Sequence, residues 1–213
     1  KYDRILDLSE GEERAKWIPG ARLNIVDSCF QNADDSTAVV LQEENGPLQR
    51  ISQKQLLEKV NRVANSLVSE GLNPGDRIAI DMPMTLEAVC IYLGAIKAGI
   101  VVATIADSFT PNEIEVRMRI TRPKLLFTQD LLHRAGKTLP MYAKVLEAQP
   151  PKTIVVHTSQ AGPKLREGDK YFSDFLVEKD EFESHVCDPG DAITILFSSG
   201  TTGEPKAIPW NHV

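Results

Sequence analysis

A segment near residue 200 combines residue types that suit the binding of phosphate groups. The run SSGTTGEPK at 198–206 follows the apolar stretch 192–197 and begins with six small or hydroxyl-bearing residues. Small residues let backbone N–H groups turn inward and form a concavity for an anion. The hydroxyl groups add hydrogen-bond donors without bulk, and Lys206 supplies a positive charge. The pattern favours a polyphosphate as the ligand.

Other motifs of this kind do not fit the segment. A P-loop ends in Gly-Lys-Ser/Thr, whereas the residues here are Pro205, Lys206 and Ala207. The dinucleotide fingerprint fails because Gly200 and Gly203 have no earlier glycine partner, and the GxSxG elbow of esterases is missing too. On composition alone, a hairpin tip made of ordinary turn residues is the alternative.

The elements that must position this segment alternate regularly between helix and strand. Apolar runs predict strands at 78–80, 100–106, 125–127, 153–156 and 192–197. Apolar spacing and capping residues predict helices over 52–71, from 85 to 97, from 110 onward and over 140–148. Such alternation predicts an α/β fold with a largely parallel sheet flanked by helices on both faces.

The remaining stretches predict smaller elements. The charged opening, 1–20, favours a solvated helix or arm. Two β-prone runs, 38–41 and 48–51, flank an Asn-Gly pair and predict a hairpin. Residues 158–170 are polar and predict a surface loop, and 174–178 are expected to form a short helix.

The composition of the chain argues against nucleic acid and membranes as its binding partners. The chain has 213 residues, a net charge of −6, 42% hydrophobic residues and 25% charged residues. These values predict a globular protein without an electrostatic footprint for nucleic acid or anionic membranes. The longest apolar run, 98–106, is shorter than the ~20 residues that a membrane helix needs, so no transmembrane segment is expected.

Cysteine and histidine are not arranged as metal ligands. Cys29, Cys90 and Cys187 are odd in number and form no CxxC pair, so we expect them in the core of a protein from a reducing compartment. The histidines lack metal-ligand spacing, and His212 is interpreted as a packing residue. Lys97 is expected in the last turn of its helix, where a cation is favourable.

The run at 198–206 resembles the glycine- and threonine-rich phosphate loop of the adenylate-forming, AMP-binding superfamily. That superfamily includes acyl-CoA synthetases, adenylation domains of peptide synthetases and luciferases. The run LGAIKAG at 93–99 is similar to the family's second core motif, and 51–80 resembles the start of its domain. The run WIPGARLN at 17–24 is similar to the acetyl-CoA synthetase branch, with plant acyl-activating enzymes as the nearest likeness.

The resemblance implies a domain plan and a reaction. Residues 1–36 would be an N-terminal lead-in segment, and 37–213 a partial adenylation domain that stops after the phosphate loop. The full-length protein would be an acid–thiol ligase, an ATP-dependent acyl-CoA synthetase. It would convert a carboxylate and ATP into an acyl-adenylate and pyrophosphate, then form a thioester with coenzyme A. This fragment alone is expected to be inactive, because no catalytic set is complete in it.

The resemblance also implies which residues contact the phosphates of ATP. They are Ser198, Ser199, Gly200, Thr201, Thr202, Gly203 and Lys206. The hydroxyl residues would donate hydrogen bonds, the glycines would let the backbone approach closely, and the lysine would pair with phosphate oxygens. Glu204 and Pro205 are expected to shape the loop, and Ala207 to be extended. A Mg²⁺ ligand and the acyl pocket are expected after residue 213.

Two other functions stay open at this point. An adenylating enzyme could pass the acyl group to a carrier protein, or a non-catalytic binding protein could have kept the fold. The expected partners are a small-molecule carboxylate, ATP and coenzyme A. The similarity of 17–24 to acetyl-CoA synthetases favours a small or medium acid in fatty acid metabolism. A peroxisomal or cytoplasmic location is expected.

Overall fold

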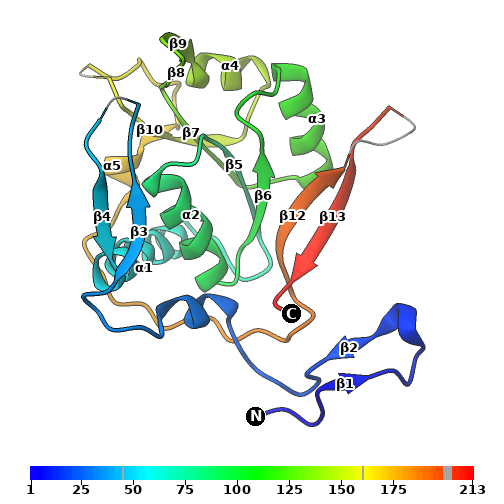
Figure 1. Cartoon of the computed structure of the whole chain (residues 1–213). Helices are drawn as coiled ribbons and strands as arrows, with labels where there is room; N and C mark the ends of the chain where they lie inside the picture. The colour runs from blue at the N-terminus through cyan, green and yellow to red at the C-terminus, as the bar shows by residue number, and fades with distance from the viewer. Residues whose placement is uncertain (45, 160, 199–202) are drawn as a thin grey trace.

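A seven-stranded sheet forms the centre of the computed structural model, which describes residues 1–44, 46–159, 161–198 and 203–213. Its strand order is β11-β10-β7-β5-β6-β12-β13. The strands are β5 (Arg77–Asp81), β6 (Val101–Ile105), β7 (Leu125–Gln129), β10 (Lys152–Val156), β11 (Lys170–Tyr171), β12 (Ala192–Ser198) and β13 (Lys206–Asn211). All neighbours are parallel except β12 and β13. The predicted, largely parallel α/β sheet is confirmed (Figure 1).

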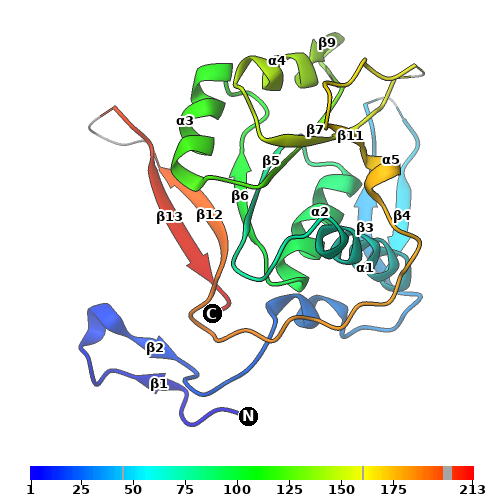
Figure 2. The same cartoon turned by 180° about the vertical axis from the view of Figure 1, so that it is seen from behind.

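Helices cover both faces of the sheet, as Figures 1 and 2 show. They are α1 (Gln53–Ser69), α2 (Leu86–Lys97), α3 (Pro111–Thr121), α4 (Met141–Glu147) and α5 (Phe172–Phe175). Because side chains alternate along a strand, β5 sends Ile78 and Ile80 into the core cluster beneath α1 and α2. Ala79, between them, joins the second cluster beneath α3 and α4.

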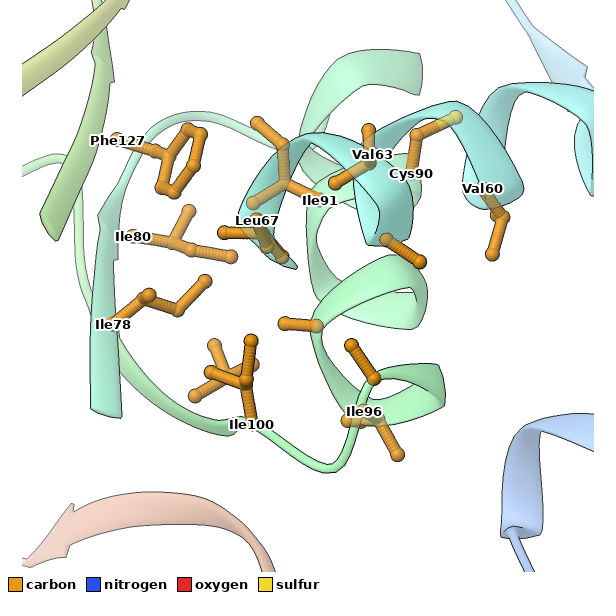
Figure 3. Close-up of a cluster of buried hydrophobic side chains, with 14 of the residues drawn as sticks. Val60, Val63, Leu67, Ile78, Ile80, Cys90, Ile91, Ile96, Ile100 and Phe127 are labelled. Atoms are coloured by element: carbon orange, nitrogen blue, oxygen red, sulfur yellow. The ribbon is translucent and has the colours of Figure 1, made fainter. Parts of the chain in front are cut away.

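The larger core lies between α1, α2 and the sheet (Figure 3). Phe127 of β7 is fully buried there and meets the ring of Phe175 edge-on, with 5.4 Å between ring centroids. The two helices approach closely at Gly94, where a Cβ would lie 2.8 Å from Cγ1 of Val63. A glycine is therefore required by space at this crossing.

The expected helix starts are confirmed. Ser52 and Gln55 form a complete capping box at α1, and Thr110 and Glu113 do the same at α3. The Thr85 hydroxyl accepts a hydrogen bond from the backbone N–H of Ala88 at the start of α2. These local contacts fix where each helix begins after its strand.

Within the described part of the chain, three small hairpins lie outside the main sheet. The pair β3 (Thr37–Leu41) and β4 (Gln49–Ser52) matches the predicted hairpin. The pair β8 (Leu131–Arg134) and β9 (Lys137–Pro140) was not predicted, because its residues show no clear apolar alternation. At the N-terminus, β1 (Leu6–Asp7) and β2 (Lys16–Trp17) form a hairpin arm. The short 3₁₀ helix η1 (Glu12–Arg14) lies between the two strands. Of the two predictions for residues 1–20, the arm is therefore confirmed and the solvated helix was wrong. A second 3₁₀ helix, η2 (Ile25–Phe30), follows.

Other details differ from expectation. Helix α5 begins and ends earlier than the predicted 174–178. Cys90 and Cys187 are buried, but Cys29 is exposed. Lys97 does lie in the last turn of α2, yet it is buried and donates to Oδ1 of Asn61 at 2.6 Å. His212 packs as expected and accepts a hydrogen bond from the N–H of Ile25. Among the described residues, no helix is long and apolar enough to cross a membrane.

Candidate functional site

The phosphate-loop candidate is the tip of the β12–β13 hairpin. β12 runs parallel to β6, with Thr194 opposite Val102 and Ile195 opposite Ala103. Its end at Ser198 therefore lies at the edge where the carboxyl ends of β5, β6 and β7 also meet. In open α/β sheets ligands bind outside this edge. β13 returns antiparallel, which confirms the hairpin that composition alone suggested.

Three of the seven expected phosphate contacts lie within the described residues. Ser198 and Lys206 are cross-strand partners at the last pair of the hairpin, with Ser198 half-buried and Lys206 exposed. Gly203 has φ +96°, and a Cβ there would meet no described atom within 4 Å. This positive φ favours glycine over residues with a Cβ. Ser199, Gly200, Thr201 and Thr202 lie outside the described residues. Ala207 lies in β13, extended as expected.

Helix α3 contacts the hairpin tip on both sides, at Phe197 of β12 and at Glu204 before β13. The Arg117 guanidinium lies 3.8 Å from the ring centroid of Phe109 and 5.2 Å from that of Phe197, the residue before Ser198. Arg119 donates from Nη2 to Oε1 of Glu204 at 2.6 Å. Figures 1 and 2 both show α3 beside this hairpin. Neither arginine was singled out in the sequence, because α3 and the loop lie far apart along the chain.

An apolar pocket of about 630 Å³ opens beside the hairpin. Its wall includes Met82 and Pro83 after β5, Tyr92 of α2, Phe109 after β6, and Leu196 of β12. Such a lining suits an apolar group and offers few hydrogen-bond partners. The pocket and the loop share β12, so a ligand at the carboxyl edge would meet an apolar wall and a polar tip together.

A charged cluster lies at the same sheet edge on the α4 side. Asp81, the last residue of β5, is fully buried, and burial raises the pKa of its carboxyl to about 6 despite Lys144 nearby. Lys144 Nζ lies 3.1 Å from Oδ2 of Asp81 and donates to the carbonyl oxygen of Asp107. Arg134 forms a two-bonded pair with the Asp107 carboxylate. A lone carboxylate ending an apolar strand was the only sequence signal for this cluster.

Asp130 connects the ends of the neighbouring strands β7 and β10. Its carboxylate accepts hydrogen bonds from the backbone N–H groups and hydroxyls of Thr158 and Ser159. These bonds outweigh the opposing effect of burial and lower the pKa of Asp130 to about 2. The carboxylate thus joins the end of β7 to the chain after β10. Across the described ranges, no three His, Cys, Asp or Glu residues come together as a metal site.

Comparisons with known proteins match this chain over most of its length. The family model described as "AMP-binding enzyme" matches residues 26–213. The chain is 42% identical to "Probable acyl-activating enzyme 18, peroxisomal" of Arabidopsis thaliana, over 97% of this chain and 31% of that protein. It is 43% identical to "Hexanoyl-CoA synthase" of Cannabis sativa, over 93% of this chain and 29% of that protein.

A solved structure repeats the fold. The acetoacetyl-CoA synthetase from Streptomyces lividans superposes with a TM-score of 0.88 at 26% identity, over 99% of this chain and 33% of that one. The chain therefore spans about a third of the length of the proteins it matches.

Proposed function

Because this chain belongs to the AMP-binding enzyme family, we propose that it forms the phosphate-binding part of an ATP-dependent acyl-CoA synthetase. The observation that carries the proposal is the β12–β13 hairpin, which brings Ser198 and Lys206, the two ends of the run 198–206, to the carboxyl edge of the sheet. Similarity to two plant enzymes named for acyl activation and hexanoyl-CoA synthesis supports it.

The proposed chemistry joins two anions and releases a third. A carboxylate oxygen attacks the α-phosphorus of ATP, the bond to the bridging oxygen breaks, and pyrophosphate leaves with its electron pair. The coenzyme A thiol then loses its proton and attacks the acyl carbonyl, releasing AMP. Positioning and charge neutralisation must supply the catalysis. Lys206 and the hydroxyls of Ser198, Ser199, Thr201 and Thr202 hold the β- and γ-phosphates in this proposal.

The proposed substrates are a carboxylic acid, ATP and coenzyme A. The name "Hexanoyl-CoA synthase" of one relative favours a small or medium carboxylic acid as the substrate. ATP and coenzyme A are co-substrates, and Mg²⁺ would neutralise phosphate charge with ligands from chain after residue 213. A peroxisomal location is proposed from the name of one relative. The division into a lead-in segment, 1–36, and a partial adenylation domain, 37–213, stays a prediction.

Pyrophosphate exchange into ATP by the full-length protein tests the proposal. A panel of straight-chain acids is assayed with the wild type, Lys206→Ala and Lys54→Ala, which removes an exposed lysine of α1. Lys206→Ala is expected to lower exchange at least tenfold, because a charge-assisted contact contributes roughly 1.5–3 kcal/mol. Lys54→Ala is expected to match the wild type.

The alternatives give different results in the same assay. Exchange without formation of a coenzyme A thioester would indicate transfer to a carrier protein. ATP binding without exchange for any acid would indicate a non-catalytic binding protein. Normal exchange by Lys206→Ala would remove the phosphate role of that lysine.

A further inference from the structure

We propose that Arg119 is a positioning residue. It holds the carboxylate of Glu204 away from the phosphates that residues 198–206, the β12–β13 loop, would bind. The inference rests on the proposed function, because it concerns the ATP site. The observation behind it is an ion pair, 2.6 Å from Nη2 of Arg119 to Oε1 of Glu204, that joins α3 to the loop. The two residues are 85 positions apart in the chain.

The loop contains an acid that its proposed ligand would repel. Glu204 stands two residues before Lys206, with Pro205 between them. Glu204 lies in the bend just before β13, which begins at Lys206, so the two opposite charges are close neighbours along the chain. A free Glu204 carboxylate would therefore compete with phosphate for the Lys206 ammonium or face the phosphates directly. Either outcome weakens the binding of a polyanion.

The observed pairing avoids both outcomes. Arg119 takes the Glu204 carboxylate, and no carboxylate of a described residue lies within 4 Å of the Lys206 ammonium. The lysine in this arrangement is available to an external anion. In this proposal Arg119 acts on the ligand through Glu204, so its role is positioning.

Other contacts fix the position of helix α3, from which Arg119 extends. Its first turn is fixed by the capping box of Thr110 and Glu113. Two residues before Arg119, Arg117 is buried between the rings of Phe109 and Phe197, and the latter belongs to the strand that enters the loop. The helix thus contacts the residue before the loop and the residue near its end. Arg119 therefore contacts Glu204 from a helix that also packs against β12 through Arg117 and Phe197.

The test is a double-mutant cycle in the full-length protein. The variants are Arg119→Ala, Glu204→Gln, the two together, and Arg119→Lys. Arg22→Ala is the matched control, because Arg22 and Asp188 form an ion pair of 2.7 Å with side-chain exposures of 57% and 63%, against 62% and 68% for Arg119 and Glu204. Asp188 precedes β12, so this pair lies at the opposite end of that strand. Exchange kinetics give KM for ATP and kcat at low and high salt.

Arg119→Ala is expected to raise KM for ATP roughly threefold to tenfold with kcat within about twofold. The increase should shrink at high salt because the charges are exposed. In the Glu204→Gln background, Arg119→Ala should change KM less than about twofold. Arg119→Lys should recover most of the loss, and Arg22→Ala should behave as the wild type.

Two results would overturn the inference while leaving the proposed function intact. One is an active enzyme whose KM for ATP is unchanged by Arg119→Ala. The other is an increase of equal size in the Glu204→Gln background, since the arginine would then act without the carboxylate. A wild-type protein with no exchange overturns the proposed function itself, and this inference with it.

Discussion

Strands β7 and β13 belong to one sheet but have opposite surroundings. All five residues of β7 are buried, whereas all six of β13 are exposed. β7 lies between β5 and β10, beneath helices on both faces, and β13 is an edge strand. Within this chain the buried interior strands therefore contribute most of the stability, and the hairpin that carries the candidate chemistry is attached to the sheet through β12.

The edge strand also carries a feature that interior strands exclude. Pro209 lies in β13 opposite Ile195 and has no N–H to donate. Proline is tolerated at a sheet edge, where it also discourages pairing with another strand. Substitutions in β7 should therefore lower mainly the free energy of unfolding. Substitutions in the hairpin should raise mainly the KM for ATP.

The largest expected effect is at the centre of β7. Phe127→Ala should lower the free energy of unfolding of the full-length protein by about 3–5 kcal/mol, because it removes a fully buried ring and leaves a cavity. Denaturant titration measures the change. A loss below about 1 kcal/mol would show that the core does not depend on this strand.

A pH-dependent effect is expected at Asp81. Its pKa of about 6 in the folded protein exceeds the ordinary 3.8, so the folded state binds the proton more tightly. The stabilisation by this proton is complete below about pH 4 and is lost as the pH rises through 6. Relative to the wild type, Asp81→Asn should therefore gain about 2–3 kcal/mol of stability between pH 4 and pH 7. A constant difference across these pH values would contradict the raised pKa.

A smaller effect on stability is expected in the loop itself. Gly203→Val places a β-branched residue at φ +96°, which should cost about 1–2 kcal/mol of unfolding free energy. The change should also raise KM for ATP, since strain in the tip displaces its phosphate donors. Thermal melts and ATP titration are compared, with Gly168→Val as a control at another exposed glycine of positive φ. Weaker ATP binding in both variants would argue against a special role for the loop.

The smallest effect is expected in β13. Ile208 is 44% exposed in the chain of residues 1–213, so in that chain Ile208→Thr should change the free energy of unfolding by less than about 0.5 kcal/mol. Denaturant titration of both Ile208→Thr and Phe127→Ala in the chain of residues 1–213 makes the comparison direct. A loss of 2 kcal/mol or more for Ile208→Thr would contradict the exposed position of this side chain.

The sequence predicted the elements that depend on near neighbours. The capping boxes at Ser52 and Thr110 marked the starts of α1 and α3, and both are confirmed. The apolar runs marked β5, β6, β7, β10 and β12. The segment 198–206 was recognisable because its glycine, hydroxyl and lysine residues are contiguous. The β8–β9 hairpin was missed because its four-residue strands carry a mixed polar sequence.

Contacts between distant residues were decided only by the tertiary structure. The sequence by itself determined helix starts, buried strands and a loop suited to phosphate, because each depends on residues within a few positions. It did not determine that β12 lies beside β6, or that Arg119 reaches Glu204 across 85 positions. Nor did it show that Asp81 is buried beside Lys144. Strand order and helix placement set those distances, and they follow from how the whole chain buries its apolar faces rather than from local spacing.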